Sequence, residues 1–399
     1  HILEAELEDD RVQKAQRDLR IGSVWQERLV DEVEARKAYL QAMELDPDDQ
    51  EITHLARTSS LEQEALQPYI GLLERLLAQE RFGNPAPRHL EVAALYDTHL
   101  GHREKALEHY GAVLELEPFH PEALWASDRL YEAAGEDSIR VSGLERLAEV
   151  VPTTHDRMEV HGRLSVVAER LGDTERMLKS LRFIADHPEA TTLERVQDAL
   201  EIMSDKYRAD ERYTDEREVL DRLVDLTADV DEKSVLLVRA AGASQEAGNY
   251  EGAVERLQKR VDLEPALVQP WLDIERLVGE SGSPEELVGI LESQSRALEK
   301  GVAREEAVLR LVDLLRGDLG RYRDVLSAVE MLLNEDTSEE TLDELVARLD
   351  DPNIAPIVGP PLADFFAEKE LPAKEANIWE WLLENFGEEL EGDKPRRRL

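Results

Sequence analysis

The sequence predicts an all-α fold built from repeated pairs of antiparallel helices. A sequence motif recurs along the chain. In each copy a small residue is followed by an apolar or aromatic residue four positions later and by a proline twelve positions later. The three clearest copies end at Pro47, Pro118 and Pro265. A sequence motif repeated in this way indicates a repeated structural unit, and this unit decides the fold before any single element is considered.

Glycines mark the expected turns. Six of them each follow one helical run and precede another, at steps of 34, 37, 76, 34 and 38 residues: Gly101, Gly135, Gly172, Gly248, Gly282 and Gly320. The step of 76 holds two periods, one of them degenerate. Glycine enters the left-handed backbone region without a steric penalty, and the proline that closes a unit cannot continue a helix. Each period of about 34 residues is therefore two helices and a turn.

The repeats resemble those of the tetratricopeptide repeat (TPR) family. The best copy matches at Leu237, Ala240, Ala241, Gly248, Asn249, Tyr250, Ala253, Leu257 and Pro265, and the next at Trp271, Ile274, Gly282 and Leu287. About nine degenerate copies lie between residues 19 and 336, about four fifths of the chain. The resemblance implies a right-handed superhelical solenoid whose first helices line a concave groove, where protein partners bind.

Two copies depart from the family pattern. In the copy ending at Pro118, Gly101 and Tyr110 are in register but Tyr96 is one residue out of phase. In the following copy Arg140 replaces the small residue, which puts close packing of its two helices in doubt. Small residues at this position let two helix backbones approach.

The chain is expected to divide into four parts. Residues 1–18 form a helical lead-in that continues from a preceding part, and residues 19–336 form the repeat array. Residues 337–392 contain an acidic helix and aromatic-rich helices that cap the last repeat, because a solenoid must cover its terminal apolar face. Residues 393–399 form a basic tail that we expect to be disordered.

Charge excludes several classes of partner. The 399 residues include 89 acidic and 48 basic ones, a formal net charge of −41. Such a surface repels nucleic acid and anionic lipid, so we expect no nucleic-acid partner. No apolar run is long enough to insert into a membrane. Cysteine is absent, which fits the cytoplasm that we favour and also the periplasm.

No residue pattern indicates catalysis, a metal site or a cofactor. The densest group of imidazoles comprises His99, His102, His109 and His120, but it spans the Gly101 turn and lacks a carboxylate at metalloprotease spacing. We therefore interpret these histidines as surface or turn residues. Phosphate-binding and nucleophile motifs are also missing from the sequence. The chain is expected not to be an enzyme.

Two groups near the C-terminus are candidate partner-binding residues. Residues 334–351 carry eight carboxylates and one arginine, and within this run we select Glu339, Glu340, Asp343 and Glu344. They can receive a basic segment, or they can be a solvated helix start that the helix dipole favours. Trp379 and Trp381 are two positions apart and cannot share one helix face, so one of them is expected to point outward.

One specialised TPR activity is disfavoured. Family members that hold the C-terminal carboxylate of chaperones use Lys and Asn on successive first helices. The stretches that we expect to face the groove carry Glu91, Leu95, Leu124, Asp128, Arg239 and Ser244 instead.

The sequence therefore predicts a noncatalytic scaffold or adaptor that binds other proteins, some with basic segments, through the groove and the termini. Two alternatives stay open at this point. The chain can be a structural subunit of a larger complex, or the regulatory region of an enzyme whose catalytic domain precedes residue 1.

Overall fold

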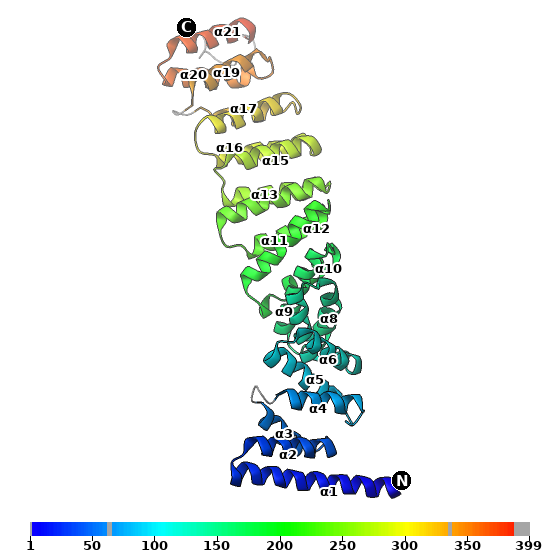
Figure 1. The fold of residues 1–399 in the computed structure, drawn as a ribbon. Coiled ribbons are helices and arrows are strands. Elements are labelled where there is room, and N and C mark those ends of the chain that lie inside the picture. The colour runs from blue at the N-terminus through cyan, green and yellow to red at the C-terminus, as the bar shows by residue number, and fades with distance from the viewer. Residues whose placement is uncertain (1, 62–65, 334–336, 387–399) are drawn as a thin grey trace. The chain divides into compact units, whose positions relative to one another are not determined.

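A computed structural model describes residues 2–61, 66–333 and 337–386, and within these ranges every regular element is helical. The chain forms two compact units, residues 1–196 and 197–399, and the boundary falls within helix α11. In each unit the helices follow one another in sequence order (Figure 1). The predicted basic tail, residues 393–399, lies outside the described residues.

The first unit begins with a long helix and continues as helix pairs. Its elements are α1 (Ile2–Val24), η1 (Trp25–Leu29), α2 (Glu32–Leu45), α3 (Gln50–Ser60), α4 (Leu66–Ala78), α5 (Ala86–Leu95), η3 (Tyr96–Leu100), α6 (Arg103–Leu116), α7 (Pro121–Ala134), α8 (Asp137–Val150), α9 (Thr154–Arg170), α10 (Thr174–Asp186), η4 (Pro188–Ala190) and the start of α11 (Leu193–Ala209). The helix predicted over the first residues thus runs to Val24 and packs against α2 as the first helix of a pair.

The second unit repeats the same arrangement. After α11 its elements are α12 (Tyr213–Leu226), α13 (Val230–Glu246), α14 (Tyr250–Leu263), α15 (Val268–Ser281), α16 (Pro284–Ala297), α17 (Val302–Arg316), α18 (Tyr322–Glu330), α19 (Glu339–Ala347), η5 (Arg348–Asp350), α20 (Ala355–Glu368) and α21 (Pro372–Phe386). From α1 to α18 the described helices form nine successive pairs. The predicted all-α array of antiparallel pairs is confirmed.

Left-handed residues close the turns within the pairs, but not all of them are glycines. Five of the six predicted glycines have φ between 60° and 75°, and Gly282 does not, because its φ of −98° and ψ of −175° are extended. In the degenerate copy Glu211 takes the left-handed conformation with φ 57°, and in the first pair Val30 does so with φ 54°. The turn geometry is thus kept where the glycine is lost, at the steric cost that a side chain incurs there.

A π-helical turn explains why Tyr96 is out of phase. Tyr96 opens η3, a five-residue π-helix that ends at the left-handed Gly101. A π-turn holds one residue more than an α-turn, so the aromatic residue moves back by one position relative to the glycine. Trp25 opens the equivalent π-helix η1, which ends at Val30.

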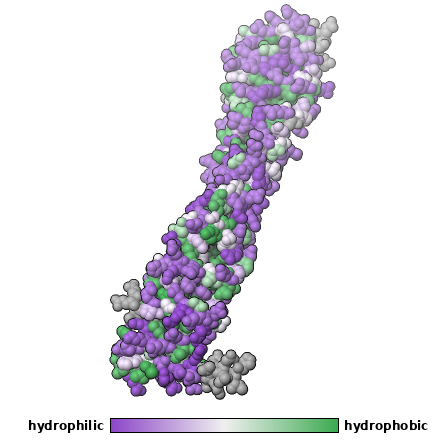
Figure 2. All heavy atoms as spheres, turned by 45° about the vertical axis from the view of Figure 1, so that its right-hand side comes forward, coloured by the Kyte–Doolittle hydropathy of each residue, from purple (hydrophilic) through white to green (hydrophobic). Residues whose placement is uncertain are grey.

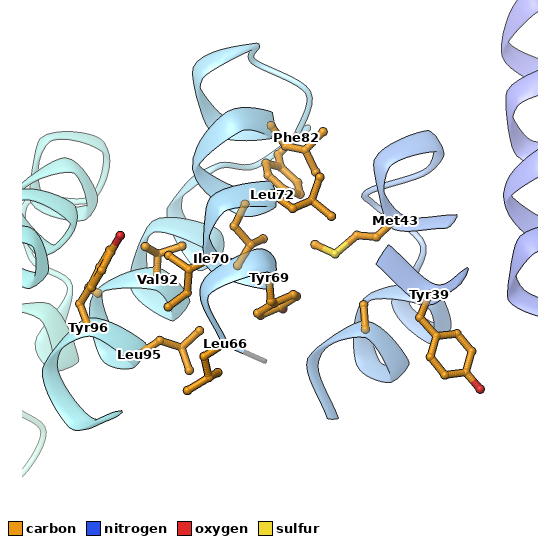
Figure 3. Close-up of a cluster of buried hydrophobic side chains, with 14 of the residues drawn as sticks. Tyr39, Met43, Leu66, Tyr69, Ile70, Leu72, Phe82, Val92, Leu95 and Tyr96 are labelled. Carbon is orange, nitrogen blue, oxygen red and sulfur yellow. The ribbon is translucent and has the colours of Figure 1, made fainter. Parts of the chain in front are cut away.

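The buried positions of the second helix in a pair can be counted from the left-handed turn residue. The side chains five and nine positions after it are buried in the second helix, as for Ala35 and Tyr39 and again for Ala106 and Tyr110. Figure 3 shows Tyr39 and Met43 from α2 on one side of α4, and Val92, Leu95 and Tyr96 on the other. The buried tyrosines keep their hydroxyls paired, since Tyr69 donates to Glu91 at 2.6 Å and Tyr96 to Glu74 at 2.6 Å.

Arg140 does not prevent α7 and α8 from packing, because its charge is neutralised in place. The side chain is 2% exposed, and its Nε donates to Asp128 Oδ1 at 2.7 Å. Two further guanidinium nitrogens donate to Asp137 at 3.1 Å and Glu132 at 3.0 Å. Burial alone would lower the pKa of Arg140, but these carboxylates outweigh it and raise the pKa above its usual range. The doubt about this pair is therefore resolved by a buried ion cluster.

Candidate partner-binding surfaces

Arginines link successive first helices in a repeating pattern of ion pairs. In each case a carboxylate on a first helix, or on the π-helix that extends it, binds an arginine about one repeat later, which for Arg348 lies in η5. The pairs are Asp97–Arg129, Asp128–Arg163 (3.1 Å) and Glu159–Arg195 (3.9 Å) in the first unit, and Glu201–Arg239 (2.9 Å), Glu275–Arg310 (3.0 Å) and Asp313–Arg348 (2.8 Å) in the second. Partly exposed pairs of this kind add little stability each, but they position neighbouring helices.

This pattern also decides which charges are available to partners. Many of the arginines are bound within the fold, whereas the carboxylates outnumber the basic residues by 89 to 48. Figure 2 shows hydrophilic residues over most of the visible face, with smaller apolar areas among them. The surface that a partner meets is therefore acidic and interrupted by apolar areas.

An exposed apolar strip crosses three first helices of the second unit. We define the strip as Ile202 on α11, Val235 and Val238 on α13, and Leu272 on α15, which are 41%, 60%, 39% and 38% exposed. Val235 and Val238 are three positions apart, so they share one face of their helix. Apolar side chains that recur on successive helices indicate an interaction surface more strongly than isolated ones do.

An ion pair and a hydrogen bond connect the neighbouring helices that carry the strip. Arg239 binds Glu201, and these two residues adjoin Val238 and Ile202 in the sequence. Further along, Arg276 on α15 donates to the side-chain oxygen of Gln245 on α13 at 3.4 Å. The three helices are thereby held side by side along the strip.

Two glycines keep the strip shallow and open. A Cβ built at Gly242 or at Gly279 would meet nothing within 4 Å, so both positions face free space. Asp205, with a side chain that is 75% exposed, and the half-exposed Glu201 border the strip. Both carboxylates pair with Arg239, and the Arg276 side chain on α15 is 49% exposed, so the margin of this apolar surface carries both signs of charge.

A second candidate surface is a pocket between α19 and α21. Its volume is about 520 Å³, and Val346, Ala347, Ile378 and Trp381 provide apolar lining. Asp343 and Asp350 add two carboxylates to its wall. Lys374 also lines it and binds Asp343 with an Nζ–Oδ1 distance of 2.6 Å.

The structure brings together two of the six predicted site residues. Trp381 and Asp343 line the same pocket, although α20 lies between their helices in the sequence. Trp379 is 3% exposed and packs into the core of the second unit, so the outward-facing tryptophan of the pair is Trp381.

The other acidic candidates lie in the first turn of α19 or in an ion pair within the fold. Glu339 and Glu340 are exposed in the first turn of α19, where the helix dipole favours carboxylates. Glu344 binds Arg348 with an Oε2–NH1 distance of 3.2 Å. Two further carboxylates of the predicted acidic run, Glu335 and Asp336, lie outside the described residues. A role of any of these residues in partner binding stays a prediction.

Four of the six first-helix residues compared with the chaperone-binding pattern are buried and were wrong as groove positions. Leu95, Leu124, Asp128 and Ser244 are all at most 3% exposed, so they belong to the core rather than to a binding surface. A repeat whose helices are packed on two sides leaves only part of each first helix free.

The four histidines of the predicted imidazole group differ in exposure and in hydrogen-bond partners. His99 and His102 are exposed, and His120 caps α7 by accepting the amide hydrogen of Ala123 at 3.3 Å. His109 instead faces His89, with their Nδ1 atoms 2.9 Å apart, a pair that the sequence reasoning missed. Burial lowers the pKa of both. Among the described residues no three His, Asp or Glu side chains are grouped as a metal site.

Comparisons with known proteins found similar solved structures of low sequence identity. Neither a protein-family model nor a curated protein matches the sequence. Among solved structures, a tetratricopeptide repeat protein from Parabacteroides merdae ATCC 43184 is 16% identical with a TM-score of 0.31, covering 71% of this chain and 99% of its own. YrrB, described as a TPR protein with an unusual peptide-binding site, is 15% identical with a TM-score of 0.28, covering 49% and 94%.

A third similar structure is Naa15/Naa10 bound to HypK-THB, 14% identical with a TM-score of 0.29, covering 94% of this chain and 66% of the other. The present chain has successive helix pairs, left-handed turn residues within the pairs and buried side chains at repeating positions. These features make it a TPR-like helical repeat protein. No helix in the described part of the chain is both long and apolar enough to cross a membrane.

Proposed function

We propose that the chain is a noncatalytic scaffold that binds a segment of a partner protein across the apolar strip of α11, α13 and α15. The observation that carries the proposal is the exposure of Ile202, Val235, Val238 and Leu272 on successive first helices. Burying such side chains in an interface is favourable, at about 25 cal/mol for each Å² of apolar surface removed from water.

Electrostatics select the kind of partner segment. Glu201 and Asp205 beside the strip pair with Arg239, but the whole chain carries a net charge of −41. A segment with apolar side chains and flanking Lys or Arg complements this surface and is attracted to it during encounter. Nucleic acid carries the same sign of charge as the chain and is disfavoured.

A second candidate function, a permanently assembled structural subunit, rests on a different surface. Around the turn between α1 and α2, five apolar side chains are between 42% and 76% exposed: Ile21, Val24, Leu29, Val30 and Val33. An obligate interface is more apolar than a transient one, and this patch meets that description.

The experiment compares two variants of the full chain. Val238→Asp with Leu272→Asp places two carboxylates in the strip, and Ile139→Asp places one at a 46% exposed apolar residue of the second helix α8. Each chain serves as bait for native lysate, with a salt step before mass spectrometry and circular dichroism as the folding control.

We expect the strip variant to lose partners that the wild type and Ile139→Asp both retain, and moderate salt to release them. Equal recovery by all three chains would refute the strip as the binding surface. Partners that survive high salt and are lost on Leu29→Asp would favour the structural subunit.

A further inference from the structure

We propose that the pocket between α19 and α21 is a separate binding site for an arginine-containing segment of a partner protein. The pocket lies outside the apolar strip, so this site is additional to the proposed function. Its volume of about 520 Å³ is within the range of about 300 to 1,000 Å³ that is usual for small-ligand sites.

The pocket already holds a cation of the chain itself. The ammonium of Lys374 lies 2.6 Å from Asp343 Oδ1 and 5.7 Å from the centroid of the Phe366 ring. The Lys374 side chain is 31% exposed and that of Asp343 is 64% exposed, so water and other cations reach the pair. Phe366 is fully buried and is not among the residues that line the pocket, so Asp343 is the part of this environment that an incoming cation shares.

A guanidinium uses this pocket better than an ammonium does. Its planar fork can bind one carboxylate through two hydrogen bonds while its flat face stacks on an indole ring. The pocket offers both partners, since Asp343 and Asp350 are on its wall beside the half-buried ring of Trp381. The apolar lining residues Ile378 and Val346 accommodate the methylene groups or an adjoining apolar side chain.

Charge around the pocket favours a partner with a basic segment. Glu339 and Glu340 are exposed on the helix that supplies Asp343, and the nearby Arg348 is bound to Asp313 and Glu344. Lys374 therefore competes with the incoming arginine for Asp343, and its removal is expected to strengthen binding.

The test measures fluorescence anisotropy of a labelled peptide, Ala-Leu-Arg-Leu-Ala, titrated with the full chain. Asp350→Asn removes one carboxylate of an exposed residue without touching the core, and is expected to weaken binding about threefold to tenfold. Trp381→Ala removes the stacking surface and is expected to weaken it about tenfold. Lys374→Met is expected to tighten binding about threefold to tenfold.

Matched controls separate a pocket from general attraction to an acidic chain. Lys259→Met removes the same charge from an exposed ion pair on α14, and it should change the affinity less than twofold. The strip variant Val238→Asp with Leu272→Asp should bind the peptide as the wild type does, so failure of the strip and failure of the pocket are distinguishable.

Four results would overturn the proposal. Equal binding of a peptide with Lys in place of Arg would show nonspecific attraction, as would an equal gain from Lys259→Met and Lys374→Met. Unchanged binding by Asp350→Asn and Trp381→Ala together would place the peptide elsewhere. A marked gain in a chain ending at Asp393 would assign the pocket to the chain's own basic residues 394–398 rather than to a partner.

Discussion

Replacing Val30 by glycine should stabilise the first helix pair. Val30 has φ 54° and ψ 36°, in the left-handed region, and it closes the π-helical turn that Gly101 closes two repeats later. A β-branched residue in this region is strained, because its Cβ approaches the following carbonyl oxygen. The side chain is 76% exposed, so its removal takes little packing with it.

The magnitude follows from two opposing terms. A left-handed conformation costs an L-residue about 1 to 2 kcal/mol, which Val30→Gly recovers. Glycine loses about 0.5 to 1 kcal/mol more backbone entropy on folding, which reduces the gain. The net stabilisation is about 0.5 to 1 kcal/mol. Gly101→Val should cost a similar amount, since a Cβ there meets nothing within 4 Å and the effect is confined to the backbone.

Hydrogen exchange read by mass spectrometry suits this test, because helical repeats open locally rather than all at once. Peptides from α1 and α2 should gain protection in Val30→Gly, and peptides from α5 and α6 should lose it in Gly101→Val. Val30→Ala is the control, because it shortens the exposed side chain but keeps a Cβ. If Val30→Ala protected α1 and α2 as much as Val30→Gly, the backbone argument would be refuted.

Two further predictions concern buried charges. Asp128→Asn should destabilise the chain by about 3 kcal/mol in urea unfolding, because it leaves the Arg140 guanidinium buried without its closest carboxylate, and the double variant Asp128→Asn with Arg140→Met should recover most of the loss. An unchanged midpoint for Asp128→Asn would contradict this account. Burial, with Lys179 and other cations nearby, lowers the pKa of His161 to about 4. The unfolded chain takes up this proton near pH 6.5 and the folded chain only near pH 4, so stability should fall as the pH drops through that window. Allowing for partial solvent exposure, the loss is about 1 to 2 kcal/mol, and His161→Gln should show a correspondingly smaller difference between unfolding midpoints at pH 7 and pH 5.

The repeat could be predicted from the sequence because its signals are local. A proline ends a helix and a glycine permits a left-handed turn wherever they occur, so Pro118 and Gly135 carry their meaning within a few residues. The register of buried side chains follows from the same spacing, as Tyr110 shows. Period, helix pairing and most of the core therefore needed no knowledge of packing.

The sequence was a poor guide where a local signal was replaced. Nothing in the residue types of Val30 or Glu211 indicates a left-handed turn, and each adopts it because the flanking helices must pack as their neighbours do. Arg140 looked incompatible with a close helix pair until Asp128, twelve residues earlier on the preceding helix, was found beside it. Such compensation depends on which side chain lies opposite, which only packing decides.

Binding surfaces depended on tertiary structure still more. The sequence by itself determined that the chain is an acidic array of helix pairs, and it singled out Trp381 and Asp343 without connecting them. Their meeting in one pocket required the fold to bring α19 and α21 together, and the apolar strip depends on which side chains of three first helices stay exposed. Periodicity tells which helix face is apolar, but the contacts between helices decide which part of that face stays exposed.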